Sequence, residues 1–465
     1  MMDSPSVAFD RSIMHRYDRA GPRYTSYPSA LQFRPGLDAG AYAEAVEASP
    51  GALDAAPLSM YVHLPFCFSP CFYCGCNKVV TRHLNRVDSY VRHLLQEVSY
   101  RGAYFNRNRV VQQLHFGGGT PTFLPKKLLV ELMQRIDRHF QLTDSETRDY
   151  SIEIDPRGAD RGVLQLLAAL GFNRISLGVQ DFDDDVQRAI NRVQPIETVA
   201  KVYDAARAIG FSSINFDLIY GLPNQTPATF AATLDRVIDM RPDRLAVYGY
   251  AHMPGRFKAQ RMIRETDLPD PETRLTLLQA TIDKLCAAGY VYIGLDHFAL
   301  STDSLVRALD DGGLHRNFQG YTTHANRDLV NLGMSAIGQV GSLYMQNHRS
   351  LNDYEKAIAL GELPSARGAW MSRDDFIRGD VIQGIMCRGA VDMTEIEDRY
   401  QIDFSRYFSK ELLRLRLLSA DGLVVLSAGH IKLTPVGRLL MRNVAMSFDA
   451  YLGGEARSAQ MSRAI

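Results

Sequence analysis

Four of the six cysteines in this chain lie within ten residues, in the stretch CFSPCFYCGC from Cys67 to Cys76. Their spacing is C-x3-C-x2-C-x-C, and they directly follow an apolar run, LSMYVHLPF, that predicts a strand. Three thiolates this close together can each bind one iron of a single cubane cluster, which leaves the remaining iron without a protein ligand. The spacing therefore predicts an iron–sulfur cluster with one open iron, where a small ligand can bind.

Two other interpretations of these cysteines must be weighed. A structural zinc ion usually takes two ligand pairs from separate parts of the chain, and no second Cys or His pair at suitable spacing follows here. Inert, buried thiols are the other alternative, but packing hardly explains four cysteines among Phe66, Phe68, Phe72 and Tyr73. The iron–sulfur cluster is favoured over both.

The elements that must position this loop follow it along the chain. Apolar runs that predict strands read SMYVHL, QQLHFG, YSIEI, RISLGV, SINFDLIY, RLAVYGY and YVYIGLD. Amphipathic stretches between them predict helices over 87–100, 126–140, 160–170, 196–209, 227–240 and 271–288. This alternation indicates a parallel sheet with crossover helices, and about six such units would make an incomplete barrel.

Polar residues and glycines gather where the predicted strands end. They are His63, Gly117–Gly119, Glu153, Gln180, Asp217 and Tyr250. Parallel α/β folds build their sites at the carboxyl ends of strands, so we expect these residues to lie around one rim. The glycine run would let backbone groups approach a ligand closely, although a tight turn would also explain it.

The rest of the chain divides by composition. Residues 1–55 carry turn signals and one predicted helix near 41–48, and indicate an extended arm with a basic and aromatic cluster around Arg23. Residues 56–300 form the predicted barrel, and 301–350 are expected to cover its mouth. Residues 351–465 predict helices over 371–386, 394–400 and 404–419, then a hairpin turning at Ala428–Gly429. Such a domain would be small, mostly helical and winged-helix-like.

Composition limits the partners. Lys and Arg together number 52, as do Asp and Glu, so nothing in the overall charge favours nucleic acid or an anionic membrane. No stretch is long and apolar enough to span a bilayer. Cys286 and Cys387 are isolated, which argues against a disulfide framework and favours a reducing cytoplasm.

The cysteine loop and several further motifs carry a resemblance to a known family. C-x3-C-x2-C after a short strand resembles the radical S-adenosylmethionine (SAM) enzymes, and the additional cysteine in YCGC is similar to the oxygen-independent coproporphyrinogen III oxidases, or coproporphyrinogen dehydrogenases. The other matching motifs are RYTSYP, HFGGGTPT, SIEIDPR, LGVQDF, NFDLIYGLP, IGLDHFAL, HRNFQGYTT and GRLLMRNVAMSFDAYL. The resemblance spans nearly the whole chain and implies a partial (β/α)6 radical SAM barrel.

The resemblance also implies the cofactor contacts. A [4Fe–4S] cluster would be held by Cys67, Cys71 and Cys74. One SAM molecule, on the cluster, would be held by Tyr61, Gly118, Glu153 and Ile337. A second SAM molecule would be held by Tyr73, Gly119, Thr120, Gln180, Arg192, Asp217 and Ala251. The carboxylates suit ribose hydroxyls or an ammonium group, and Arg192 suits a carboxylate, whereas Ile337 and Ala251 rest on the resemblance alone.

The implied reaction is oxygen-independent heme biosynthesis chemistry. A 5′-deoxyadenosyl radical, made at the cluster, would remove a hydrogen from a propionate of coproporphyrinogen III. Loss of carbon dioxide and one electron would leave a vinyl group, and two such cycles would give protoporphyrinogen IX. We expect Arg23 to bind a substrate propionate and Cys76 to act near the site, although spacing does not define the role of Cys76. An electron donor and an acceptor are required but leave no mark on the sequence, and the family suggests a monomer.

Three competing functions are considered. Heme-binding trafficking proteins share the barrel, the cluster motif and the glycine run, but typically lack the fourth cysteine and the RYTSYP arm that are present here. A radical SAM methyltransferase or cyclopropanase would use the same scaffold, and the arm and the C-terminal match weigh against it. A zinc-stabilised DNA-binding protein would use the winged helix, but the neutral net charge disfavours it.

Overall fold

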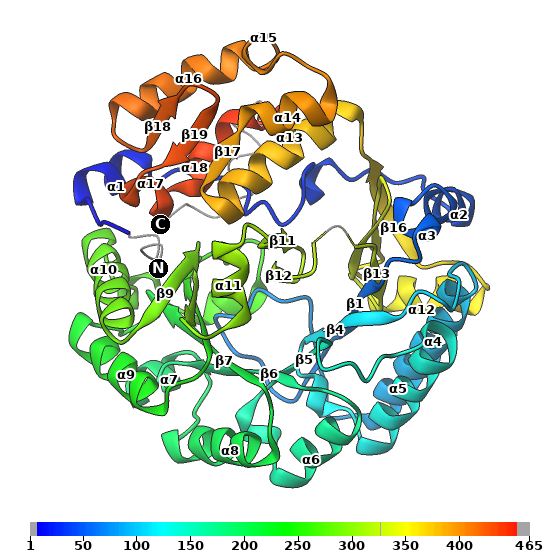
Figure 1. Cartoon of the computed structure of the whole chain (residues 1–465). Helices are drawn as coiled ribbons and strands as arrows, with labels where there is room; N and C mark the ends of the chain where they lie inside the picture. Colours follow the sequence, from blue (N-terminus) through cyan, green and yellow to red (C-terminus); the bar gives the residue numbers. More distant parts are fainter. Residues whose placement is uncertain (1–6, 326, 453–465) are drawn as a thin grey trace.

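A computed structural model of the chain describes residues 7–325 and 327–452. Its main sheet has 12 strands in the order β16-β15-β14-β13-β1-β4-β5-β6-β7-β8-β10-β9. Helices surround the outside of this curved sheet, and the C-terminal helices form a separate group at one side (Figure 1). Residues 1–6 of the predicted arm and 453–465 of the predicted C-terminal domain lie outside the described part of the chain.

Six neighbouring strands of the sheet run parallel and confirm the partial (β/α)6 barrel. They are β1 (Leu58–Leu64), β4 (Val111–Gly118), β5 (Asp149–Ile154), β6 (Arg174–Gln180), β7 (Ser213–Tyr220) and β8 (Arg244–Gly249). The crossover helices are α4 (Leu84–Gly102), α5 (Lys126–Phe140), α6 (Arg161–Ala169), α8 (Ile196–Ile209), α9 (Pro227–Met240) and α10 (Pro271–Ala287), with the short α7 (Asp184–Ala189) beside them. The predicted helices agree with these bounds within a few residues.

The seventh predicted strand does not join the parallel run. Strand β9 (Tyr290–Gly294) pairs only with β10 (His297–Leu300), which lies antiparallel between β8 and β9. A turn of two residues joins β9 to β10, and so short a connection permits only antiparallel pairing. The barrel therefore ends in a hairpin at this edge.

The other edge of the sheet is extended by strands from the segment that was expected to be a cover. Strand β13 (Leu329–Leu332) pairs parallel with β1, and β14 (Ile337–Val340), β15 (Leu343–Asn347) and β16 (Ser365–Trp370) follow antiparallel. Before them come α11 (Ser304–Asp310) and the small hairpin of β11 (His315–Asn317) and β12 (Gly320–Thr322). Much of the segment 301–350 is thus part of the sheet.

Alternation along the strands separates an apolar outer face from a polar interior. In β5, Tyr150, Ile152 and Ile154 are buried, while Ser151 and Glu153 between them line a cavity. Because successive side chains of a strand point to opposite faces, the first set packs beneath the helices and the second faces the inside of the barrel. The hydrophobic core therefore forms a ring around a polar centre.

The C-terminal region forms a helical group with a three-stranded sheet. Its helices are α13 (Arg373–Gln383), α14 (Met393–Tyr400), α15 (Phe404–Tyr407), α16 (Ser409–Ala420), α17 (Pro435–Leu439) and α18 (Met441–Ala445). The predicted hairpin is present as β18 (Val424–Ser427) and β19 (His430–Leu433), and β17 (Ala390–Asp392) adds an unpredicted third strand beside β19. Helix α12 (Leu351–Ala359) instead packs on α4 of the barrel.

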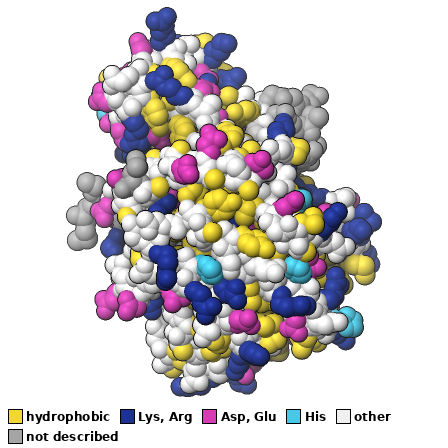
Figure 2. Space-filling model, turned by 90° about the vertical axis from the view of Figure 1, so that its right-hand side faces the viewer, with side chains coloured by type: hydrophobic (Ala, Val, Ile, Leu, Met, Phe, Trp, Pro, Cys, Tyr) yellow, Lys and Arg dark blue, Asp and Glu magenta, His cyan; other side chains and the backbone are white. Residues whose placement is uncertain are grey.

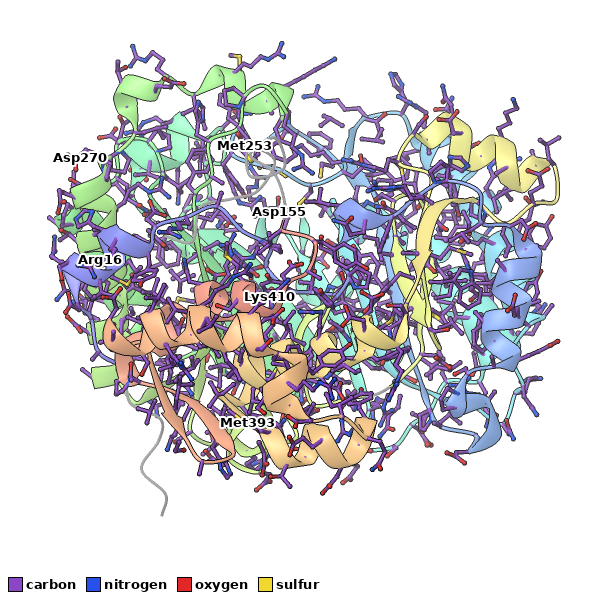
Figure 3. All side chains as sticks on the ribbon, turned by 90° about the horizontal axis from the view of Figure 1, so that it is seen from above. Arg16, Asp155, Met253, Asp270, Met393 and Lys410 are labelled. Carbon is purple, nitrogen blue, oxygen red and sulfur yellow. The ribbon has the colours of Figure 1, made fainter. Side chains whose placement is uncertain are left out.

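The arm lies across the molecule and touches both regions. Its helices are α1 (Arg11–Tyr17), α2 (Ala39–Glu47) and α3 (Pro50–Leu53). Figure 3 shows Arg16 of α1 on the same side of the molecule as Asp270, at the start of α10, and Arg11 donates to Glu272 of α10 at 3.2 Å. On the side of the C-terminal region, Arg16 forms an ion pair at 2.6 Å with Asp421, next to α16.

Two surface properties bear on the expected partners. On the face shown in Figure 2, Lys and Arg side chains are interspersed with Asp and Glu rather than gathered into one basic surface. Among the described residues, no helix is both long enough and apolar enough to cross a membrane.

Candidate active site

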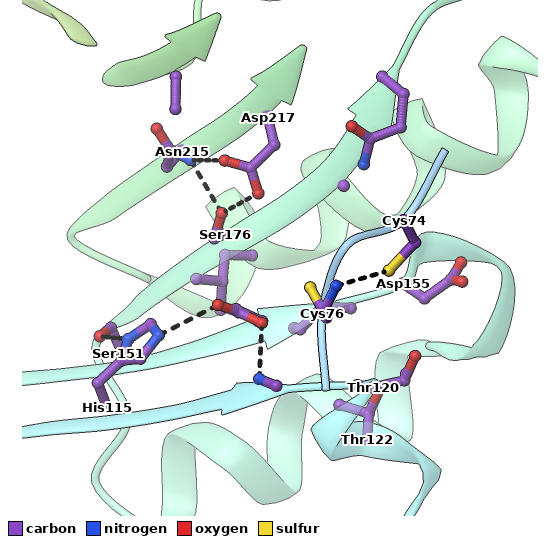
Figure 4. A pocket seen from close by; sticks show the side chains of 18 of the residues that line it. Cys74, Cys76, His115, Thr120, Thr122, Ser151, Asp155, Ser176, Asn215 and Asp217 are labelled. Atoms are coloured by element: carbon purple, nitrogen blue, oxygen red, sulfur yellow. Dashed lines mark hydrogen bonds and ion pairs between the residues drawn. The ribbon is translucent and has the colours of Figure 1, made fainter. Parts of the chain in front are cut away.

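A cavity of about 1000 Å³ runs along the inside of the barrel. At one end it is lined by the cysteine loop and by residues from the carboxyl ends of the strands, such as Gly118 and Gln180. At the other end it reaches residues that begin strands, such as Asp149 and Arg174. Figure 4 shows that side chains from several neighbouring strands point into this space.

The cysteine loop joins the barrel through a two-residue parallel pairing of β2 (Phe66–Cys67) with β3 (Val79–Val80). Cys67, Cys71, Cys74 and Cys76 all line the cavity. The Thr120 hydroxyl donates to Cys67 Sγ at 3.8 Å. Burial raises the pKa of the Cys67 thiol to about 11 in the metal-free protein, so ionisation of this thiol needs a compensating positive charge such as a metal.

Cys74 and Cys76 interact with each other. The backbone N–H of Cys76 donates to Cys74 Sγ at 3.4 Å (Figure 4). A hydrogen bond from the Cys76 side chain lowers the pKa of Cys74 to about 5, and the same bond raises the pKa of Cys76 well above its ordinary value. Of the two, Cys74 is therefore the thiolate, which is the form that binds metal.

The glycine run packs directly against the cysteine loop and its supporting strand. A Cβ on Gly118, whose φ is +118°, would lie 2.6 Å from the His63 ring, and one on Gly119 would lie 2.6 Å from the Pro65 carbonyl. Backbone atoms cannot move out of the way as a flexible side chain can. The run is therefore required by packing within the protein, and Gly118 and Gly119 still line the cavity.

Glu153 sits in a network of hydrogen bonds below this loop. It accepts from the N–H of Gly118 at 3.1 Å and lies 3.4 Å from His115 Nε2, while His115 Nδ1 is 2.6 Å from Ser151 Oγ (Figure 4). Burial opposes ionisation of Glu153, but the contacts with His115 and Gly118 outweigh it, and its pKa lies below the ordinary value. Glu153 is therefore held as a carboxylate with a fixed orientation.

Asp217 lies in a second network on the next strands. Its carboxylate accepts from Ser176 Oγ at 2.8 Å and from Asn215 Nδ2 at 2.9 Å (Figure 4). Burial raises the pKa of Asp217 to about 6, and the negative charge of Glu153 adds to this effect. Asp217 is thus a cavity-facing carboxyl that would be stabilised by a cation or a donor on a ligand.

Arg192 links the cysteine loop to the barrel. Its Nη1 lies 3.5 Å from Cys71 Sγ and 3.1 Å from Asp155 Oδ2, and its Nη2 donates to the Gly178 carbonyl at 2.7 Å. The buried Nε has no hydrogen-bond partner among the described residues. Burial lowers the pKa of Arg192, but Tyr73 and Asp155 raise it above its ordinary value. This guanidinium is therefore a fixed positive charge beside the thiols.

Most of the predicted site residues lie together around the cavity. Those that line it are the four clustered cysteines with Tyr73, Gly118, Gly119, Thr120, Glu153, Gln180, Arg192 and Asp217. Those that do not line it are Arg23, Tyr61, Ala251 and Ile337.

Two of these four remain close to lining residues. The Tyr61 ring stacks on His115 with centroids 5.8 Å apart, and its hydroxyl is 3.0 Å from His63 Nδ1. The Ala251 carbonyl accepts from Gln260 Nε2 at 3.2 Å, and the same amide donates to the Tyr73 carbonyl at 2.9 Å.

The other two, Ile337 and Arg23, lie in a strand and in an ion pair that were not predicted. Ile337 begins β14, where it pairs with Gln346. Arg23 forms an ion pair with Asp296, and its guanidinium lies 5.7 Å from the ring centroid of Tyr248, which lines the cavity. Arg23 thus already has a carboxylate partner within the protein.

Several polar lining residues were missed from the sequence. They include His115, Ser151, Asp155, Ser176, Asn215, Tyr248, His297 and Tyr321. The first five alternate with apolar residues in LHF, SIEID, RISLG and NFDLI or close a strand of that pattern. Period-two alternation in strands that also read as buried is the signal for an inward polar face, and it could have located them.

The cysteines suit a cluster better than a single ion. Within 7–325 and 327–452, no three His, Cys, Asp or Glu side chains are arranged to hold one metal ion. Zinc ligands must converge on one ion, whereas the three thiolates of a cubane each bind a separate iron. Three thiols that line one cavity, beside the donors Thr120 and Arg192, therefore fit an iron–sulfur cluster with a ligand-accessible side.

Comparison with known proteins defines the class. The family model described as the Radical SAM superfamily matches residues 61–237, and the model described as the HemN C-terminal domain matches residues 371–440. Together with the barrel and the cysteine loop, these matches define a radical SAM enzyme, which uses a [4Fe–4S] cluster and SAM.

Individual relatives define the family. An oxygen-independent coproporphyrinogen III oxidase of Pseudomonas aeruginosa is 49% identical over 452 residues, covering 97% of each chain. The Escherichia coli K12 protein of the same name is 46% identical over 464 residues, covering 100% of each chain. The solved structure of E. coli coproporphyrinogen III oxidase (HemN), described as a radical SAM enzyme, superimposes with a TM-score of 0.91 at 45% identity, covering 96% of this chain and 100% of that one. This chain belongs to the family of oxygen-independent coproporphyrinogen III oxidases.

Proposed function

We propose that this enzyme converts coproporphyrinogen III to protoporphyrinogen IX by oxidative decarboxylation of two propionate side chains, without oxygen, in heme biosynthesis. The observation that carries the proposal is the match of nearly the entire chain to coproporphyrinogen III oxidases, including the C-terminal domain. The cavity supports it, because about 1000 Å³ suits a large ligand beside its cofactors.

Cys67, Cys71 and Cys74 are the proposed cluster ligands. When bound, the cluster and SAM supply a primary carbon radical that removes hydrogen from the substrate. The chain's own contribution is positioning: Thr120 and Arg192 place donors beside two of the thiols, at 3.8 and 3.5 Å, which stabilises negative charge there. Cys76, whose side chain hydrogen-bonds to Cys74, is proposed as a close neighbour of the site rather than a ligand.

The polar lining falls into two groups that support two SAM molecules. Glu153 and Gly118, with Tyr61 and Ile337, would hold the first. Asp217, Arg192, Gln180, Gly119, Thr120, Tyr73 and Ala251 would hold the second. The unpartnered Nε–H of Arg192 would donate a hydrogen bond to a methionine carboxylate. Anaerobic equilibrium dialysis of the reconstituted enzyme should therefore give two SAM per chain, and a plateau at one would contradict this division.

The remaining proposals concern the segments around the cavity, the electron donor and acceptor, the cellular location and the oligomeric state. The arm and the segment 301–350, of which Leu305, Gln319 and Tyr321 line the cavity, would exclude water and other molecules. This matters because a carbon radical attacks almost any nearby C–H bond. An electron donor of low potential and an electron acceptor are required. A reducing cytoplasm suits the cysteines, none of which forms a disulfide in the described structure. We propose a monomer.

An anaerobic product assay tests the function. Reconstituted protein would receive SAM, a strong reductant, coproporphyrinogen III and an electron acceptor, and the assay would follow protoporphyrinogen IX and 5′-deoxyadenosine. The proposal predicts that both form in step. Deoxyadenosine without the new porphyrinogen would refute the substrate, and heme binding without either product would indicate a trafficking protein instead.

A further inference from the structure

Arg316 of β11 is a buried cation without a counter-ion in the described structure. Its side chain is 3% exposed. Its Nε donates to the Arg23 carbonyl at 3.2 Å, but its Nη1 has no hydrogen-bond partner, and no described carboxylate forms an ion pair with it. A buried charge without a partner opposes folding, so its presence points to an anion supplied by a ligand.

Arg316 is not itself a lining residue of the cavity, but its guanidinium packs against one. It lies 4.7 Å from the ring centroid of Tyr321, which lines the cavity. The ring of His297, also in the lining, is 5.3 Å from Tyr321, and its buried Nδ1 likewise has no partner among the described residues. Two neighbouring groups capable of donating hydrogen bonds to an anion are thus unused.

Positive charge is in excess at this wall. Burial and the charges of Arg316 and Arg23 hold the pKa of His297 well below its ordinary value. Burial and Arg316 also lower the pKa of Arg23, although Arg23 pairs with Asp296. Burial and Arg23 lower the pKa of Arg442 to about 10. Each of these shifts would be relieved by an anion bound here.

Tyr248, which also lines the cavity, lies against this wall: its ring centroid is 6.0 Å from that of His297 and 5.7 Å from the Arg23 guanidinium. Burial raises the pKa of Tyr248, Asp217 raises it further, and Arg23 and Arg316 oppose this. The Tyr248 hydroxyl is therefore influenced both by Asp217 and by the two guanidinium groups. An anion at Arg316 would bind beside Tyr321, whose ring neighbours His297, and His297 in turn neighbours Tyr248.

We propose that Arg316, with His297 and Arg23, forms a carboxylate-binding subsite that holds a propionate of the substrate other than the one that reacts. This inference rests on the proposed function. A guanidinium suits a carboxylate because its N–H groups match both oxygens. An ion pair would stabilise a carboxylate more than the departing carbon dioxide, so a firm anchor suits a propionate that is retained in that cycle.

Binding of an acid and of its neutral analogue tests the subsite. Cluster-reconstituted enzyme without reductant would be titrated anaerobically with coproporphyrinogen III and with its tetra-amide, and free ligand measured after ultrafiltration. Arg316→Met should weaken binding of the acid about tenfold to a hundredfold, the range for a hydrogen bond to a charged group, and leave the amide nearly unchanged. Arg316→Lys keeps the positive charge but loses the paired N–H groups of the guanidinium, so its affinity for the acid should lie between those of wild type and Arg316→Met. This variant also controls for a folding defect of the methionine variant.

Arg438→Met is the matched control. Arg438 is also buried, at 6% exposed, and its Nε also has no partner among the described residues. Neither arginine is itself a lining residue, but Arg438 donates to the Tyr292 carbonyl of β9 at 3.3 Å, whereas Arg316 packs on Tyr321, which lines the cavity. Its loss should leave the ratio of acid to amide affinity unchanged. Because Arg316 has no counter-ion, Arg316→Met should also unfold no earlier than wild type in the absence of ligand.

Other outcomes would overturn the inference. Equal weakening of acid and amide by Arg316→Met would mean a structural role. Weakened SAM binding with unchanged porphyrinogen binding would assign the carboxylate to the cofactor. If wild type converts coproporphyrinogen III and the variant binds it normally, only this subsite fails; if wild type neither binds nor converts it, the proposed function fails as well.

Discussion

At the scale of single residues, the interior of the barrel combines groups that stabilise opposite charges. Arg192 places a guanidinium beside Cys71, while Asp217 faces the cavity with its carboxylate bonded to Ser176 and Asn215. The hydroxyl and the amide only partly compensate Asp217 for the loss of water, so its pKa is raised by burial to about 6. Such a group lowers stability in the free protein and is compensated when a ligand donates to it.

Asp217→Asn should therefore stabilise the ligand-free protein at neutral pH. A raised pKa means that the folded state binds more protons than the unfolded state between about pH 4 and pH 6, so wild-type stability falls as pH rises through this window. Since Asp217 faces the cavity, we expect a difference on the order of 1–3 kcal/mol above pH 6. Denaturant unfolding of wild type and Asp217→Asn at pH 4.5 and pH 7 would measure this difference. The same difference in the free energy of unfolding at both pH values would contradict the prediction. Binding of the proposed second SAM molecule should be lost in the same variant, while the first is retained.

The residues of the site could be predicted from the sequence only where a pattern marked them. The cysteine spacing and the glycine run marked the loop and its neighbour, and the resemblance added residues such as Gln180 and Arg192, which line the cavity. His297 and Tyr321 were missed because they come from a hairpin edge and a short loop strand without periodicity. Ion pairs such as Arg23 with Asp296 could not be predicted, because they join residues far apart in the chain.

At the scale of elements, a buried polar network fixes α4 against the extended edge of the sheet. Glu97 and Arg101 of α4 are fully buried and form an ion pair at 2.9 Å. Glu97 also accepts from Asn347 of β15 at 2.7 Å, from Tyr354 of α12 at 2.7 Å and from the Gly333 N–H at 2.7 Å. One carboxylate thus connects α4, α12, β15 and the turn between β13 and β14.

Glu97→Ala should be strongly destabilising. It would leave the Arg101 guanidinium buried without its carboxylate, and breaking a buried pair in this way costs about 3–5 kcal/mol. The free energy of unfolding in urea would show the loss. Asp235→Asn, which removes an exposed pair with Lys284 on the outer helices, serves as the control and should cost less than about 1 kcal/mol. Similar losses for both variants would contradict the account of this network.

Elements were more predictable than their connections. Regular amphipathic periodicity located α5, α8 and α9 to the residue. The antiparallel position of β10 and the parallel pairing of β13 with β1 were not predicted, because pairing between strands depends on contacts that local sequence does not encode.

At the scale of the whole molecule, the arm connects the barrel to the C-terminal region. Tyr17 donates a short hydrogen bond to Asp421, and Arg16 pairs with the same carboxylate. Tyr24 donates to Asp449 at 3.0 Å, and Arg442 Nε donates to the Pro22 carbonyl at 3.0 Å. Because Arg23 lies between these anchors and beside Tyr248, the C-terminal region holds the arm against the cavity wall.

Asp421→Asn should loosen the arm without unfolding the barrel. It removes the charge that accepts from both Arg16 and Tyr17. Hydrogen–deuterium exchange should become faster in residues 10–24 and stay unchanged in β5 and β6. Glu395→Gln, which affects ion pairs to Arg388 and Arg399 inside the C-terminal region, should not change exchange in the arm. Unchanged exchange in Asp421→Asn would mean that the anchors elsewhere suffice.

The transfer of one hydrogen atom tests the central claim most directly. Coproporphyrinogen III carrying deuterium at the β-carbons of its propionates would be turned over anaerobically, and 5′-deoxyadenosine would be analysed by mass spectrometry. The account predicts that deoxyadenosine gains one deuterium for each vinyl group formed. Deoxyadenosine that stays unlabelled while the porphyrinogen is unchanged would contradict it, because the radical would then act on something other than the propionate.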